Sequence, residues 1–93
     1  MIHSFADNKA RAIFNSEVPN NFPQDILGTA KRRLTELAAA VSLMDLAHVR
    51  GYRLERLKGD LKDFWSIRVN QQWRIVFRWD NGAHDVKIMD YHA

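Results

Sequence analysis

The sequence contains no cysteine, only two prolines and four glycines, and no long apolar run. The absence of cysteine excludes disulfides, thiol nucleophiles and thiolate metal ligands. No apolar stretch approaches the ~20 residues that span a bilayer, and the first ten residues carry no signal-peptide core. These absences predict a cytoplasmic protein with no membrane partner.

The side chains that often carry catalysis are dispersed along the chain. The four histidines (His3, His48, His84 and His92) show no metal-ligand spacing. The glycines are isolated and form no phosphate-binding loop, and no serine lies in a nucleophile-elbow sequence. We therefore expect no metal and no cofactor. An enzyme built from this sequence would rely on acid–base and electrostatic catalysis.

The composition is that of one small globular domain, and its positive charge is unevenly distributed. The 93 residues are 46% apolar and 27% charged, which suits a single core and one domain spanning residues 1–93. The net charge is +3, but residues 50–79 carry eight basic and three acidic side chains. This concentration of charge predicts a polyanionic partner, and the alternative is an ordinary solvated face.

The clearest structural pattern lies between residues 64 and 79. Apolar residues alternate over 65–69 and again over 73–79, which predicts two antiparallel strands joined by a turn near residues 70–72. Arg74 and Arg78 fall on the opposite face of the second strand, roughly 13 Å apart along it. We expect an open sheet face that presents both guanidinium groups to a phosphate backbone.

Two helices are predicted before these strands. Asp7 is a suitable N-cap for a helix over 8–15, and a second apolar stripe of helical period runs from Pro23 to about Ala40. Further strands are predicted at residues 2–5, 52–58 and 85–91, the last following an Asn-Gly turn. The expected fold is an α+β domain in which the two N-terminal helices pack on one face of a mainly antiparallel, twisted sheet.

Several polar residues near the ends of the predicted strands suit RNA cleavage. In this reaction the 2′-hydroxyl of the substrate attacks the adjacent phosphorus, so the protein must hold the phosphate, stabilise its charge and move two protons. Lysine and arginine perform the first two tasks, and histidine, glutamate or tyrosine the third. The candidates are Glu55, Lys58, Arg74, Asp90, Tyr91 and His92. The alternative for His92 is a frayed terminus without a role.

Five segments, in this order, resemble one family of bacterial proteins. They are MIHSF (1–5), YRLERLKGD (52–60), WSIRV (65–69), QWRIVF (72–77) and DYH (90–92). Together they resemble the HigB branch of the RelE/ParE toxin superfamily, the killer proteins of plasmid-maintenance systems. The resemblance runs the length of the chain and implies a RelE-like fold and a toxin of a type II toxin–antitoxin system.

The resemblance also implies an activity and roles for single residues. The implied activity is a ribosome-dependent, metal-independent mRNA endonuclease. Lys58 and Arg74 would neutralise the scissile phosphate. Asp90, Tyr91 and His92 would form the terminal part of the site, with His92 as the proton-transfer group. Contacts with RNA outside the scissile phosphate would come from Arg53, Arg56, Arg68 and Arg78.

The sequence departs from this family at one position of the site. Some relatives have a His-Pro pair where this chain has Glu55-Arg56. Glu55 could act as the base in place of that histidine, or it could be a surface residue that pairs with Arg53 or Arg56.

Two other functions compete with the nuclease. ParE-like members of the superfamily share the fold but poison DNA gyrase. The other alternative is an inert module that binds RNA or the ribosome. For the toxin, the resemblance implies four partners: mRNA, the ribosome, a HigA-like helix-turn-helix antitoxin, and operator DNA bound only through that antitoxin.

Overall fold

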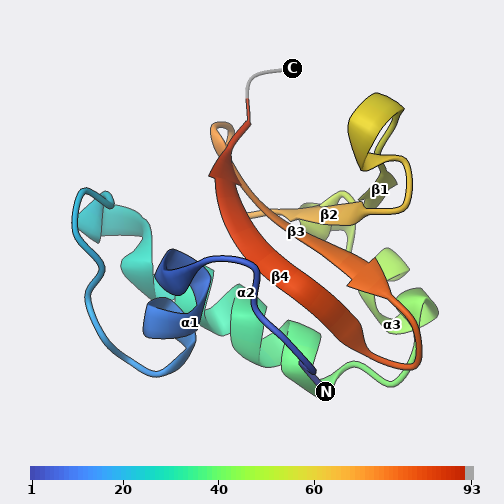
Figure 1. Ribbon diagram of the computed structural model, residues 1–93, viewed down its shortest axis with the longest axis horizontal. Helices are drawn as coiled ribbons and strands as arrows, with labels where there is room; N and C mark the ends of the chain where they lie inside the picture. The colour runs from blue at the N-terminus through green and yellow to red at the C-terminus, as the bar shows by residue number, and fades with distance from the viewer. Residues whose placement is uncertain (92–93) are drawn as a thin grey trace.

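The computed structural model of the protein describes residues 1–91 and has helices packed against a four-stranded sheet (Figure 1). Its helices are α1 (Asn8–Phe14), α2 (Leu27–Ala39) and α3 (Leu43–Ala47), and its strands are β1 (Glu55–Arg56), β2 (Trp65–Arg68), β3 (Trp73–Trp79) and β4 (Ala83–Asp90). Single 3₁₀ turns lie at Gln24–Ile26, Arg50–Tyr52 and Gly59–Leu61. The predicted α+β class is confirmed. No helix within residues 1–91 is long and apolar enough to cross a membrane.

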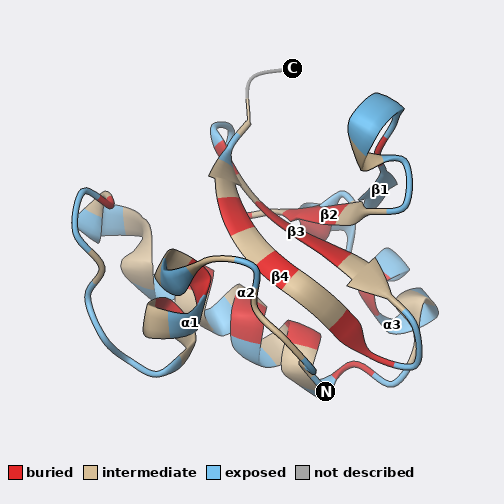
Figure 2. Cartoon of the chain, in the orientation of Figure 1, coloured by how far each residue is buried: buried red, intermediate tan, exposed pale blue. Residues whose placement is uncertain are grey.

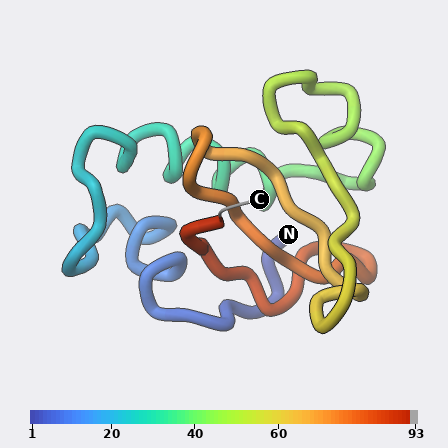
Figure 3. Tube along the Cα trace, turned by 90° about the horizontal axis from the view of Figure 1, so that it is seen from above, coloured from blue at the N-terminus to red at the C-terminus, as the bar shows by residue number. Residues whose placement is uncertain are grey.

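The sheet is antiparallel throughout its four strands, which lie in the order β1-β2-β3-β4. The N-terminal strand predicted at residues 2–5 is reduced to two parallel bridges, Ile2 with Ala83 and Phe5 with Val86. Figure 3 shows this N-terminal segment beside β4. The chain therefore closes the outer edge of β4 with its own N-terminus.

Both predicted N-terminal helices are present. The Asp7 side chain caps α1 by accepting a hydrogen bond from the Ala10 backbone at 2.7 Å. The second helix, predicted from residue 23, begins with the 3₁₀ turn and becomes α-helical at Leu27. Its stripe of Ala30, Leu34 and Leu37 is fully buried. The hydrophobic period thus fixes which side of α2 faces the sheet.

The core lies between these helices and one face of the sheet, here called the helix face. Ile67, Ile75 and Ile88 align across β2, β3 and β4 on this face, and all three are buried. Burying a side chain of this size contributes about 1.5–3 kcal/mol. Figure 2 shows buried positions alternating with more exposed ones along β4, as expected when one face packs on a core.

The strand predicted over residues 52–58 was wrong in its extent. The Tyr52 ring is buried in the core at the end of a 3₁₀ turn, and Arg53 follows in the left-handed region with φ of 47°. This backbone conformation is incompatible with a strand, so pairing is limited to Glu55 with Ser66 and Arg56 with Trp65.

The expectation of an open second face was also wrong for much of the sheet. On this face, here called the cleft face, Ser66 and Val76 are fully buried. The segment 57–64 lies over it, and a 2.9 Å hydrogen bond from the Leu57 amide to the Phe64 carbonyl joins the two ends of this segment. The uncovered remainder of the face is a cleft rather than a flat platform.

Candidate active site

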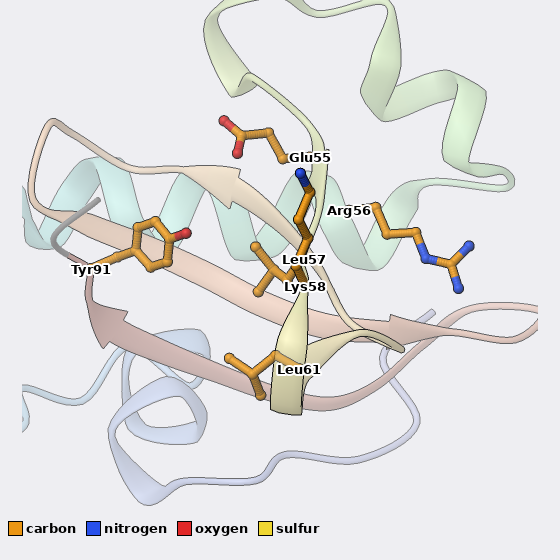
Figure 4. A pocket seen from close by; sticks show the side chains of 6 residues that line it. All are labelled: Glu55, Arg56, Leu57, Lys58, Leu61 and Tyr91. Atoms are coloured by element: carbon orange, nitrogen blue, oxygen red, sulfur yellow. The ribbon is translucent and has the colours of Figure 1, made fainter.

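The cleft lies between the β1 wall and the end of β4 (Figure 4). Its volume is about 300 Å³. The described residues that line it are Glu55, Arg56, Leu57, Lys58, Leu61 and Tyr91. Three predicted residues, Glu55 and Lys58 from one segment and Tyr91 from near the end of the chain, therefore line one hollow.

Arg74 connects the two walls of this cleft. Its Nη2 donates to Oε1 of Glu55 at 3.1 Å, and its Nη1 donates to Oγ of Ser66 at 2.9 Å. Its guanidinium carbon lies 5.3 Å from the centre of the Tyr91 ring. The sheet dictates this position, because Arg74 projects from β3 between Arg68 on β2 and Met89 on β4.

Lys58 is held at the start of a tight turn. Its backbone is extended, and Gly59 follows with φ of 67°, a conformation that glycine adopts without strain. The Lys58 residue is exposed, so its ammonium group can meet an anion that enters the cleft. A lysine and an arginine in one small cleft form a site suited to a phosphate group.

Asp90 and Tyr91, both predicted for the terminal part of the site, project to opposite faces of the sheet. Asp90 pairs with Trp73, whose indole packs edge-on against Phe22 in the core, so Asp90 projects from the helix face. Its carboxylate accepts a 3.0 Å hydrogen bond from the Gln72 side chain. Tyr91 follows on the cleft side, because successive side chains of an extended chain alternate. His92 lies outside the described residues.

The four arginines predicted to contact RNA have different surroundings. Arg56 lines the cleft and donates to the Lys62 carbonyl at 3.1 Å. Arg68 lies directly opposite Arg74 in the β2–β3 pair. The Arg53 carbonyl accepts a hydrogen bond from Nη1 of Arg74 at 3.5 Å. Arg56 thus lines the cleft, whereas Arg53 and Arg68 lie beside Arg74, and the Arg68 Nε donates to the Asn70 carbonyl at 3.1 Å.

Arg78 lies four residues further along β3 and forms an ion pair. Its Nε is 2.7 Å from Oδ2 of Asp85, and this hydrogen bond is the main reason why the pKa of Asp85 lies below its ordinary value. Asp85 is reached through a register shift in β4, where its φ is 51°. The structure thus gives Arg78 a partner within the fold.

Ser66 was not among the predicted site residues. It is fully buried, and its hydroxyl is a direct partner of Arg74. Finding it requires the β2–β3 register, in which Arg74 sits opposite Arg68, two residues beyond Ser66 on the same face. Among residues 1–91, no group of three His, Cys, Asp or Glu side chains is placed to hold a metal ion.

Comparison with known proteins assigns the family. The family described as the RelE-like toxin of the type II toxin–antitoxin system, HigB, matches residues 3–92. The chain belongs to this family. It is 33% identical over 93 residues to the Endoribonuclease HigB of Proteus vulgaris, and the aligned region covers 99% of this chain and 100% of the relative. It is 40% identical over 70 residues to Toxin HigB-1 of Vibrio cholerae, covering 75% of this chain and 74% of the relative.

The HigB membership confirms the family predicted from the five sequence segments. Membership of a type II system also implies an antitoxin partner for this toxin. The family resemblance and the observed α+β fold agree, because both place helices against one face of a small antiparallel sheet.

Proposed function

We propose that this HigB-like toxin is an endoribonuclease that cuts messenger RNA during translation on the ribosome. The observation that carries the proposal is the cleft lined by Lys58 and Tyr91, with Arg74 in contact with two of its lining residues, Glu55 and Tyr91. The name of the Proteus vulgaris relative, Endoribonuclease HigB, supports the same reaction class.

In the proposed reaction the scissile phosphate binds between the Lys58 ammonium and the Arg74 guanidinium. The 2′-oxygen of the substrate attacks phosphorus, and the bond to the 5′-oxygen breaks. The products are a 2′,3′-cyclic phosphate and a 5′-hydroxyl. The two cations stabilise the extra negative charge of the pentacoordinate transition state, and each such preorganised donor is worth about 10²–10³ in rate.

Two protons must also move: one leaves the 2′-hydroxyl and one reaches the departing 5′-oxygen. The cleft offers the Tyr91 hydroxyl from the β4 side. The family resemblance assigns His92 as the principal proton-transfer group, with Asp90 supporting the same terminal segment.

The ribosome and its message are the proposed macromolecular partners. Arg56 at the cleft and Arg53 and Arg68 beside Arg74 would rest on RNA beyond the scissile phosphate, with Arg78 at the outer margin. Binding of this kind depends on phosphate contacts, so ribosome association should weaken steeply with salt. The proposed antitoxin is a HigA-like helix-turn-helix protein, and operator DNA would be reached only through it.

The test uses the purified full chain, translating ribosomes and a defined message, with cleavage sites mapped by primer extension. We expect cleavage only when ribosomes translate the message, and a loss of about 10²-fold or more in Lys58→Ala and Arg74→Ala. His92→Gln tests the terminal proton-transfer group in the same assay. Uncut message together with inhibited DNA supercoiling would instead indicate a gyrase poison. Uncut message with salt-sensitive ribosome binding would indicate an inert binding module.

A further inference from the structure

Arg74 has two side-chain acceptors of very different kinds, besides a longer contact of 3.5 Å with the Arg53 carbonyl. The Ser66 hydroxyl is neutral and belongs to a fully buried residue within the sheet. The Glu55 carboxylate is charged, and its side chain is 50% exposed, whereas that of Arg74 is only 13% exposed. The arginine therefore has one partner inside the fold and one partner at the solvent boundary.

The two partners are also anchored differently. Ser66 lies in β2, which pairs with both of its neighbours. Glu55 lies in β1, an edge strand of two residues that pairs on one side only. A short edge strand can shift at little cost, since few backbone hydrogen bonds hold it. Glu55 can therefore leave the guanidinium without disturbing the core.

A phosphate and a carboxylate bind a guanidinium group in the same way. Both present paired anionic oxygens that accept hydrogen bonds from its N–H edge. Oε1 of Glu55 lies 3.1 Å from Nη2 of Arg74, where a phosphate oxygen would bind in the proposed reaction. Substrate and Glu55 thus compete for one edge of Arg74, while Ser66 keeps the other edge fixed.

We propose that Glu55 is an exchangeable counter-ion that RNA phosphate displaces from Arg74, and that Ser66 is the positioning residue that keeps Arg74 aimed into the cleft. This inference rests on the proposed function, because it takes Arg74 as the phosphate-binding group. Under this proposal, the loss of the Glu55 charge has the opposite effect from the loss of a general base. Removing a competing anion strengthens substrate binding, whereas removing a base slows the reaction.

The experiment measures binding apart from cleavage. The probe is a short RNA with a single 2′-deoxy substitution at the scissile position, which binds but lacks the attacking hydroxyl, and the readout is fluorescence anisotropy with the full chain. We expect Glu55→Gln to bind about three- to tenfold more tightly, in keeping with the modest strength of half-exposed ion pairs. We expect Ser66→Ala to bind several-fold more weakly.

Two controls separate this exchange from a general charge effect. Glu17→Gln removes one negative charge from the loop after α1, where Glu17 lines a different hollow, and should leave the affinity nearly unchanged. In an Arg74→Ala background, Glu55→Gln should lose its benefit and behave like Glu17→Gln. Thermal unfolding of each variant checks that the fold is retained.

Cleavage kinetics give a second readout that a merely structural role would not move. Glu55→Gln should lower KM for the translated message, and Ser66→Ala should raise it in protein that is still folded.

The counter-ion inference is overturned if Glu55→Gln binds the probe no better than the wild type, or if neither protein binds it. It is also overturned if the variant loses about 10²-fold in kcat with no gain in affinity, as the loss of a general base would cause. If the wild type binds the probe but leaves translated message intact, the nuclease proposal fails while the affinities still decide the role of Glu55.

Discussion

Arg78 and Asp85 face each other across the β3–β4 pair, with 2.7 Å between the guanidinium Nε and a carboxylate oxygen. The Ser4 hydroxyl joins them, since it accepts a hydrogen bond from the Asp85 amide at 2.8 Å. The N-terminal segment, β4 and β3 therefore meet at one ionic contact. Because Asp85 sits at the register shift of β4, this contact also fixes the local pairing.

The first prediction concerns the pH dependence of this contact. The Arg78 hydrogen bond lowers the pKa of Asp85 below its ordinary 3.8, so the pair stabilises the fold above about pH 4 and is lost as the pH falls through the lower folded value. Asp85→Asn should cost at most about 1 kcal/mol at pH 7, because both side chains are nearly half exposed. Urea unfolding measures this cost.

At pH 3 the difference between Asp85→Asn and the wild type should shrink. The matched control is Asp25→Asn, a carboxylate in the first turn of the Gln24–Ile26 3₁₀ segment. A destabilisation of Asp85→Asn that is the same at both pH values would contradict an ionic contribution.

A second prediction concerns Tyr52. Burial, followed by the influence of the nearby Glu36 carboxylate, raises the pKa of this phenol to about 12. A raised pKa means that the neutral form is favoured in the fold, so the contribution is complete below pH 10 and declines as the pH rises toward 12. The wild type should therefore lose stability over this range faster than Tyr52→Phe, as measured by thermal unfolding. Parallel declines in the two proteins would show that Tyr52 does not titrate with folding.

The third prediction contrasts two glycines. Gly82 has φ of 123°, and an added Cβ would lie 2.6 Å from the His3 ring and 2.9 Å from the Met1 carbonyl. Gly82→Ala should therefore destabilise the protein by about 1–3 kcal/mol and loosen the N-terminal segment from β4.

The matched substitution is Gly28→Ala in α2, where an added Cβ meets nothing within 4 Å. It should stabilise the protein by about 0.4–1 kcal/mol, because alanine restricts the unfolded chain and favours helix. Chemical denaturation measures both variants. Equal effects of the two substitutions would refute the steric argument.

The fourth prediction tests the geometry of Arg74 separately from its charge. Arg74→Lys keeps the positive charge but cannot reach Ser66 and a phosphate with a rigid fork of N–H groups. Cleavage of translated message should fall by about 10- to 100-fold. The control, Arg32→Ala, removes a positive charge from the exposed side of α2 and should retain activity. A lysine variant as active as the wild type would mean that charge alone is needed at this position.

Local patterns predicted much of the fold. Asp7 caps α1 through Ala10, and the apolar stripe of α2 recurs every three or four residues, so each helix follows from its own local sequence. The alternation in β2 and β3 likewise predicted their buried rows, which include Ile67 and Ile75. These features depend on neighbours along the chain.

The remaining features depend on residues that are distant in sequence. The pattern over residues 52–58 suggested a full strand, but burial of Tyr52 and the left-handed Arg53 leave only two paired residues. The Arg74–Ser66 contact needs the β2–β3 register, and the Arg78–Asp85 pair needs the register shift in β4. Tertiary pairing of this kind cannot be inferred from the period of a single segment.

The brevity of β1 has a consequence for how the cleft tolerates substitution. The wall that carries Glu55, Arg56 and Lys58 is exposed and is joined to the sheet through only two paired residues. Substitutions there alter the chemistry of the cleft while leaving the buried layer intact. The charged groups on this wall can therefore be exchanged with little penalty in folding.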